Sequence, residues 1–202
     1  MQEKNIRQSN QARTEATRKA LIQASRMLFA EKGYADTGTP EIVKAAAVTR
    51  GALYHHFRDK ADLFAAAVRA EAEAVANEIE ESAVDAPTAA AALAAGGAAY
   101  FAAMAAPGRI RLLLFDGPAV LGHAAIRKID AATGGGALRD GLIAALPKTT
   151  DPASVDALAD MLSAAFDRAA IAIAAGAAPA AYRESLCLLV DALVGDPKKN
   201  PR

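Results

Sequence analysis

The sequence predicts an all-α fold, and three observations support this class. Hydrophobic residues make up 53% of the 202 residues, and alanine, the strongest helix former, supplies about half of them. No run of alternating β-branched residues predicts a strand. Glycine and proline recur at intervals that divide the chain into segments of helical length.

The chain starts with a polar stretch followed by a long helix. Residues 1–11 contain no apolar periodicity, so we expect a flexible tail. From about Ala12 to Lys32, apolar and small residues recur at helical spacing, namely Leu21, Ile22, Ser25, Leu28 and Phe29. Gly33 is a suitable helix stop because glycine tolerates the left-handed conformation there.

Residues 37–60 divide into two short helices around a tight turn. Pro40 suits the first turn of a helix, and Thr39 before it is the expected cap. Residues 47–49 form the expected turn, with Thr49 capping a second helix from about Arg50 to Phe57. The sequence therefore predicts a compact helix pair here.

The second of these helices is two-sided at about 100° per residue. One side carries Arg50, Gly51, Tyr54 and His55; the other carries mainly Ala52, Leu53, His56 and Phe57. A cation, a bare backbone, a phenol and an imidazole can reach phosphates and base edges in the major groove. This favours a helix-turn-helix with residues 50–57 as recognition helix. A plain amphipathic helix pair with a solvated face is the alternative.

The residue string itself favours DNA binding. Residues 45–64, AAAVTRGALYHHFRDKADLF, resemble the DNA-binding segment of the TetR (tetracycline-repressor-like) family of bacterial regulators. The positions that agree with the family pattern are Thr37, Ile42, Ala46, Val48, Thr49, Gly51, Leu53, Tyr54, His56, Phe57, Lys60 and Leu63. Two positions depart from it: Val43 replaces the usual alanine, and Ala47 replaces the usual turn glycine. If that turn is left-handed, alanine costs roughly 1 kcal/mol there.

This resemblance implies a set of DNA-binding residues. We expect Arg50 to read a base, most plausibly guanine, and Gly51 to allow close approach of the backbone. The remaining expected contacts, mostly with phosphates, are Thr39, Thr49, Tyr54, His55 and Lys60. Lys4 and Arg7 leave open a further contact between the N-terminal tail and DNA.

A long helix is expected over residues 60–82, linking a DNA-binding domain (residues 12–60) to a larger domain (residues 83–202). Asp59 is the expected N-cap, with Asp62 three residues on. The glutamates of the second half, Glu71, Glu73, Glu78, Glu80 and Glu81, predict a solvated face.

The larger domain is predicted to be helical throughout. The expected helices span residues 88–106, 109–115, 118–133, 137–146, 153–175 and 179–194, with a flexible corner at residues 134–136 and a frayed tail from Asp196 to Arg202. No strand precedes the three glycines of that corner, and no Gly-Lys-Ser/Thr follows, so they do not predict a phosphate loop.

An all-helical domain of this size is a usual place for a small-molecule pocket. The candidate lining residues are Tyr100, Phe101, Met104, Phe115, His123 and Phe166, although an ordinary core role is the alternative for each. Arg111 and Asp116 offer a polar anchor or a surface pair. The absence of tryptophan and the scarcity of apparently buried charge favour an apolar or weakly polar ligand.

The last two helices carry apolar stripes. In the TetR family such helices usually pair with their copies in a second subunit, which implies a homodimer. The predicted interface residues are Leu158, Met161, Leu162, Ala165, Ala169, Leu186, Leu189, Val190 and Leu193. Ordinary core packing is the alternative.

The charge distribution supports DNA as a partner and argues against an enzyme. Residues 1–60 carry 11 basic and 6 acidic residues, whereas residues 61–202 carry 12 and 17. His123 is the only histidine outside the recognition helix, and Cys187, the only cysteine, lies in an apolar run where burial is expected. We therefore expect no catalytic site, no metal and no cofactor. A polar N-terminus and the lack of a membrane-spanning stretch favour the cytoplasm.

Together these features predict a ligand-responsive repressor that binds a pseudo-palindromic operator in double-stranded DNA as a homodimer. A small molecule bound in the C-terminal domain would release it. The alternative is a constitutive DNA-binding regulator whose C-terminal domain serves dimerisation only.

Overall fold

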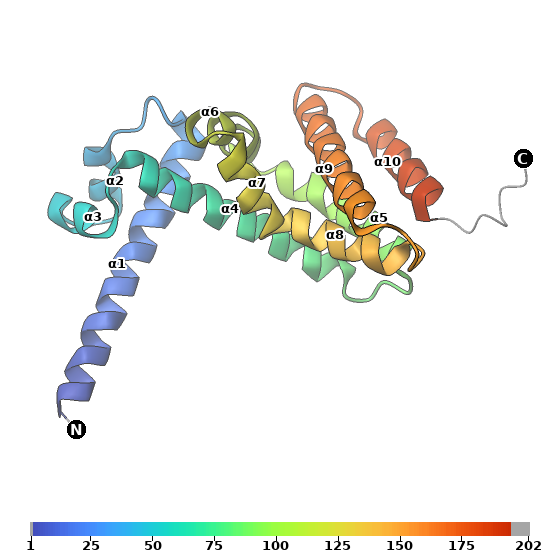
Figure 1. The fold of residues 1–202 in the computed structure, drawn as a ribbon. Coiled ribbons are helices and arrows are strands. Elements are labelled where there is room, and N and C mark those ends of the chain that lie inside the picture. The colour runs from blue at the N-terminus through green and yellow to red at the C-terminus, as the bar shows by residue number, and fades with distance from the viewer. Residues whose placement is uncertain (1, 195–202) are drawn as a thin grey trace, which may run out of the picture. The chain divides into compact units, whose positions relative to one another are not determined.

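The computed structural model describes residues 2–194, with side chains from residue 11 onward, and every regular element in this range is helical (Figure 1). The helices are α1 (Gln2–Lys32), α2 (Thr39–Ala45), α3 (Arg50–His56), α4 (Lys60–Ala83), α5 (Ala89–Met104), the π-helical segment η1 (Arg111–Asp116), α6 (Gly117–Leu121), α7 (His123–Ala131), α8 (Gly134–Ala145), α9 (Pro152–Ala174) and α10 (Pro179–Val194). The all-α prediction is confirmed. None of these helices is long and apolar enough to cross a membrane.

The chain forms two compact units. The first unit contains residues Met1–Glu71 and Pro107–Ile126, and the second contains Ala72–Ala106 and Arg127–Arg202. This division differs from the predicted boundary at residue 83, because residues 107–126 pack with the N-terminal helices. Helix α4 contributes its first half to one unit and its second half to the other.

An aromatic and aliphatic core holds the first unit together. Phe29 of α1 meets Phe64 of α4 edge to face, with ring centroids 5.0 Å apart, and Tyr34 packs on Phe64 at 4.8 Å. Four aliphatic side chains of the same unit also have no solvent exposure, namely Leu21, Ile42, Leu53 and Leu63. The predicted inward stripe of the first helix is confirmed at Leu21, Ser25 and Phe29.

Two predictions for the first unit were wrong in detail. Helix α1 begins at Gln2, not near Ala12, since no glycine or proline interrupts residues 2–32 and polar residues such as Gln, Glu, Lys and Arg tolerate a helix well. The N-cap of α2 is Gly38, not Thr39, and no side chain caps this helix. Thr39 is the first residue of α2, with Pro40 behind it in the first turn.

The second unit packs α5 against α8, α9 and α10. The expected flexible corner at residues 134–136 is instead the first turn of α8. These glycines provide close approach: a Cβ atom on Gly135 would lie 2.3 Å from the Asp130 carboxylate, and one on Gly136 would lie 2.7 Å from the Ala131 carbonyl oxygen.

Two further boundaries in the C-terminal half differ from prediction. The expected helix over residues 118–133 is divided by Gly122, whose φ of +80° ends α6. The expected short helix over residues 109–115 is a π-helical turn over Arg111–Asp116. The predicted frayed tail, Asp196–Arg202, lies outside the described residues.

Candidate nucleic-acid interface

The turn between α2 and α3 is a left-handed helix stop. The amide of Val48 donates to the carbonyl oxygen of Val43 at 3.0 Å, and the amide of Ala47 donates to that of Lys44 at 3.2 Å. This pair of bonds defines a Schellman motif, in which the residue after the cap is left-handed. That residue is Ala47, with φ +52°, the only positive φ at a non-glycine residue in the described chain.

Helix α3 is held by its cap and by one buried side. The Thr49 hydroxyl accepts a hydrogen bond from the amide of Ala52 at 3.1 Å, which confirms the predicted cap. Leu53 and the following Phe57 are buried. The opposite side, with Arg50, Gly51, Tyr54 and His55, is exposed, as the helical wheel predicts.

The exposed groups of α3 meet one residue of α2. The Arg50 guanidinium carbon lies 5.6 Å from the centre of the Tyr54 ring. Hydrogen bonding from the Thr39 hydroxyl, followed by the Arg50 guanidinium group, holds the pKa of Tyr54 below its ordinary value. Thr39, Arg50 and Tyr54 therefore form one polar cluster at the surface of the helix pair, and this cluster suits a phosphate or a base edge.

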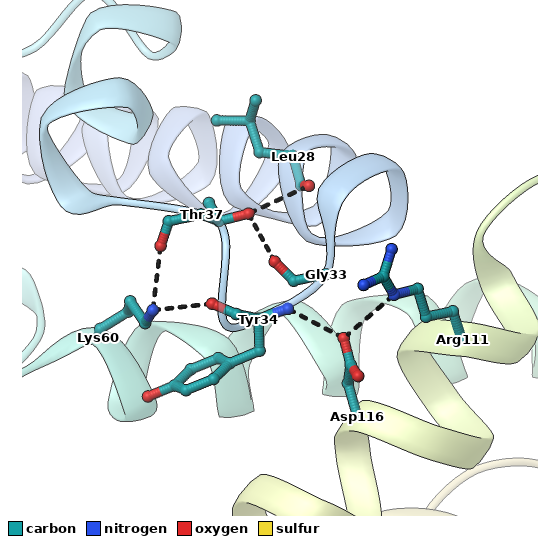
Figure 2. A network of polar contacts seen from close by, with 7 residues as sticks. All are labelled: Leu28, Gly33, Tyr34, Thr37, Lys60, Arg111 and Asp116. Carbon is teal, nitrogen blue, oxygen red and sulfur yellow. Dashed lines mark hydrogen bonds and ion pairs between the residues drawn. The ribbon is translucent and has the colours of Figure 1, made fainter.

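Lys60, which the sequence predicts as a phosphate contact, forms contacts within the protein. Its ammonium group donates to the carbonyl oxygen of Tyr34 at 2.7 Å and to that of Thr37 at 3.0 Å (Figure 2). The same group lies 4.1 Å from the centre of the Tyr34 ring. The Lys60 side chain thus fixes the loop between α1 and α2, and in this geometry it is already engaged within the protein.

The same loop is fixed by two further side chains that sequence reasoning did not assign. The buried Thr37 hydroxyl donates to the carbonyl oxygen of Gly33 at 2.7 Å and lies 3.3 Å from that of Leu28 (Figure 2). The carboxylate of Asp116, at the end of η1, accepts from the amide of Tyr34 at 2.9 Å. Arg111 lies 3.7 Å from that carboxylate, so the two side chains form an ion pair within the first unit.

A buried ion-pair group ties α1, α4 and the segment before η1 together. Glu71, 6% exposed, contacts Arg26 of α1 at 3.0 Å and the buried Arg109 at 2.5 Å. The sequence predicted a solvated glutamate here, because Glu71 begins an acidic stretch and its basic partners are 38 and 45 residues away. Only the neighbouring apolar side of α4 signals its burial.

The structure brings together only part of the predicted ligand pocket. The rings of Tyr100, Phe101 and Phe166 lie within 6.0 Å of one another, and Met104 is buried on the same helix, α5. Phe115 and His123 belong to the first unit and are exposed, Phe115 by 53%. They are therefore not among the residues that the second unit brings together around Tyr100, Phe101 and Phe166.

Acidic groups that the sequence analysis did not select adjoin this aromatic cluster. The Tyr100 hydroxyl donates to Asp167, and the Ser163 hydroxyl lies 3.4 Å from Asp130. Burial raises the pKa of both carboxyl groups and also raises the pKa of Tyr100. Between residues 11 and 194, no basic side chain forms an ion pair with Asp130 or Asp167.

The predicted dimer residues divide into two groups. Leu162, Ala169, Leu186 and Val190 are buried within the chain's own core, so they are unavailable to a second subunit. Met161 and Leu189 are exposed, by 68% and 49%, and Leu158, Ala165 and Leu193 are half-buried. Leu188, which the prediction omitted, is 69% exposed, and Cys187 beside it is exposed as well.

No group of three or more metal-binding side chains occurs in the part of the chain whose side chains are described.

Comparison with known protein families gives two matches that together cover most of the chain. Residues 21–67 match the model of bacterial regulatory proteins of the tetR family, and residues 90–196 match that of the tetracyclin repressor-like C-terminal domain.

Individual relatives agree with these matches. The transcriptional regulator AcrR of Shigella flexneri is 50% identical over 48 residues, which is 24% of this chain and 22% of AcrR. A TetR-family regulator from Pectobacterium atrosepticum has a crystal structure with TM-score 0.70 and 29% identity over 92% of this chain and 98% of its own. The multidrug binding protein EbrR, crystallised with imidazole, shares the fold at TM-score 0.66 and 22% identity, covering 89% of this chain and 90% of EbrR.

Proposed function

Because the chain belongs to the tetR family of bacterial regulatory proteins, we propose that it is a ligand-responsive transcriptional repressor. It binds a pseudo-palindromic operator as a homodimer, and a small molecule bound in the second unit releases it. The observation that carries the DNA-binding part is α3: one side is buried, and the other exposes Arg50, Gly51, Tyr54 and His55.

The contacts of these residues indicate which of them bind a base and which bind phosphates. Arg50 stands at the first position of α3 and is the candidate for a bidentate contact with guanine. Tyr54 and Thr39, which share hydrogen bonding, together with Thr49 and His55, suit phosphate oxygens. Lys60 stabilises the loop that carries this surface through its hydrogen bonds to the Tyr34 and Thr37 carbonyl oxygens.

Homodimerisation is supported by apolar side chains left exposed or half-buried on the last two helices. Leu158, Met161 and Ala165 recur at helical spacing on α9, and Leu188, Leu189 and Leu193 lie on α10. Exposed groups of this kind mark an interaction surface in a chain whose other large apolar residues are mostly buried. Two copies of a recognition helix would then meet successive half-sites about 34–36 Å apart.

Ligand binding is supported by the cluster of Tyr100, Phe101 and Phe166 with Asp130 and Asp167. Half-buried carboxyl groups that form no ion pair with a basic side chain of residues 11–194 favour a ligand that donates hydrogen bonds or carries positive charge. This revises the expectation of an apolar or weakly polar ligand. The imidazole bound to EbrR is such a donor, in a protein that shares the fold.

The helix that carries Tyr100 and Phe101 of this cluster is followed in sequence by a segment of the DNA-binding unit. Helix α5 ends at Met104, and the chain continues into Arg109, which binds Glu71, and then into Asp116, which binds the Tyr34 amide. A displacement of α5 would therefore act on the segment that holds α1 and α4. This coupling would let a ligand favour a geometry that no longer fits both half-sites.

Selection of bound duplexes from a random pool tests the proposal. The wild-type protein should enrich a pseudo-palindrome, and Arg50→Ala should reduce discrimination against a scrambled duplex roughly 5- to 150-fold, the range of 1–3 kcal/mol for one bidentate base contact. Arg69→Ala, at an exposed arginine of α4, is the matched control and should keep the discrimination. Failure of the wild type to enrich any sequence would refute the proposal.

The ligand part needs a separate measurement. Thermal unfolding against small aromatic and amine compounds, imidazole included, should reveal compounds that raise the melting temperature and also weaken DNA binding. Phe101→Ala should reduce both effects. If every compound that binds leaves DNA affinity unchanged, the protein is a constitutive regulator instead.

A further inference from the structure

Helix α1 extends well beyond the core of the first unit. The helix begins at Gln2, and among the side chains described from residue 11 onward the first buried one is Leu21. Residues 11–19 are exposed apart from the half-buried Thr17. Figure 1 shows α1 as one continuous helix whose N-terminal part runs past α2 and α3. Residues 2–19 are here called the N-terminal extension, and its described side chains, those of residues 11–19, contribute no buried residue to the core of the unit.

The extension is basic, and its base lies beside the recognition helix. It contains Lys4, Arg7, Arg13, Arg18 and Lys19 against two acidic residues, Glu3 and Glu15. The Arg18 guanidinium carbon lies 5.4 Å from the ring centre of Phe57, the residue that ends α3. The positive charge therefore starts at the end of the DNA-reading helix and continues away from the core.

The composition of the extension distinguishes between kinds of partner. A helix that docks on a protein groove or a membrane surface needs an apolar stripe at spacings of three and four residues. Residues 2–19 contain a single large apolar residue, Ile6. Their net charge of +3 instead complements phosphates, which duplex DNA presents every 1.7 Å or so along its axis.

We propose that the N-terminal extension is a second DNA-binding element, which contacts phosphates of the base pairs flanking each half-site. At about 1.5 Å per residue its 18 residues span roughly 27 Å, which corresponds to about eight base pairs. The contact adds affinity and salt dependence without sequence preference, because phosphates carry no direct sequence information. The inference rests on the proposed DNA-binding function.

The test compares two triple variants of equal charge change. Lys4→Gln/Arg7→Gln/Arg13→Gln removes three cations from the extension and leaves Arg18 in its contact with Phe57. The control, Arg127→Gln/Lys128→Gln/Lys148→Gln, removes three exposed cations from the second unit. Affinity is measured for a duplex that the wild-type protein selected from a random pool, with and without eight flanking base pairs on each side.

The extension variant should bind the flanked duplex at least ten-fold more weakly than wild type. The slope of log affinity against log salt should become shallower by roughly 0.9 per lost phosphate contact, up to about 5 for the six contacts of a dimer. Wild type and control should gain affinity from the flanks, and the extension variant should not. Unchanged melting temperatures should exclude loss of folding as the cause.

The results separate this inference from the function on which it rests. If the extension variant keeps the wild-type affinity, slope and flank dependence while Arg50→Ala loses discrimination, the extension does not bind DNA and the proposed function stands. If the control weakens binding as much as the extension variant does, the effect is one of net charge and the inference fails. If the wild-type protein selects no duplex, both proposals fall.

Discussion

The left-handed residue in the turn before α3 is an alanine, and its replacement by glycine should stabilise the protein. Ala47 has φ +52°, where an L-residue pays roughly 1–2 kcal/mol because Cβ approaches the following carbonyl oxygen. Glycine removes that cost but gains about 0.4–1 kcal/mol of conformational freedom in the unfolded chain. Ala47 is exposed, so little packing is lost with its methyl group. The expected net gain is about 0.5–1 kcal/mol.

Ala45, two residues earlier, is the matched control. It is also an exposed alanine, but it is the last residue of α2 and has helical geometry. Glycine there should destabilise by roughly 0.5–1 kcal/mol relative to alanine. The same chemical change at neighbouring exposed positions is therefore expected to have opposite signs.

Scanning calorimetry measures both variants, with hydrogen exchange of α2 and α3 reporting which unit is affected. For a chain of this length 1 kcal/mol corresponds to a shift of about 2–4 °C in melting temperature. Ala47→Gly should raise the transition of the first unit by about 1–4 °C, and Ala45→Gly should lower it. Equal decreases for both variants would show that residue 47 is not left-handed in solution, and the argument from the Schellman turn would be wrong.

Three further perturbations follow from the contacts. Lys60→Met leaves two backbone carbonyl oxygens without their donor and should lower the free energy of unfolding by roughly 2 kcal/mol in denaturant titration. If stability is unchanged and the slope of log affinity for DNA against log salt becomes shallower, Lys60 instead contacts a DNA phosphate. Asp167→Asn should raise the melting temperature at pH 7. Burial raises the pKa of the Asp167 carboxyl group above 3.8, so the wild-type protein loses stability as the pH rises from 3.8 through the folded pKa and the carboxyl group becomes charged. Below pH 3.8 the variant and the wild type should therefore melt alike. Leu188→Glu should convert a dimer to a monomer in light scattering, whereas Ile143→Glu, at a 50% exposed position of α8, should not.

Local chemistry allowed much of the DNA-binding unit to be predicted from sequence. The Thr49 cap, the Asp59 cap with its bond to the Asp62 amide at 2.8 Å, and the Gly33 stop each depend on residues within four positions. The two sides of α3 follow from a single turn of helical periodicity. Even the strained turn at Ala47 could be anticipated from the alanine that occupies the family's glycine position.

Contacts between distant residues could not be predicted in this way. The partners of Lys60 and of the Tyr34 amide lie up to 26 and 82 residues away, so no local pattern indicates them. The interface prediction failed for a different reason: α9 carries apolar residues on more than one side. Met161 and Leu162 are neighbours in sequence, yet one is exposed and the other is buried, and only tertiary packing decides which.

The polar contacts of the first unit indicate how DNA binding can depend on a segment far from the DNA. Removing one partner from a buried pair such as Glu71–Arg109 typically costs about 3–5 kcal/mol, since the remaining charge stays buried. That energy is a large part of the 5–15 kcal/mol that usually stabilises a domain. The segment that supplies Arg109 and Asp116 follows α5, which carries Tyr100 and Phe101 of the aromatic cluster. In the proposed function, a ligand would need no new contact with the recognition helix, because a modest change in the position of α5 would act on interactions that already hold α1 and α4 in place.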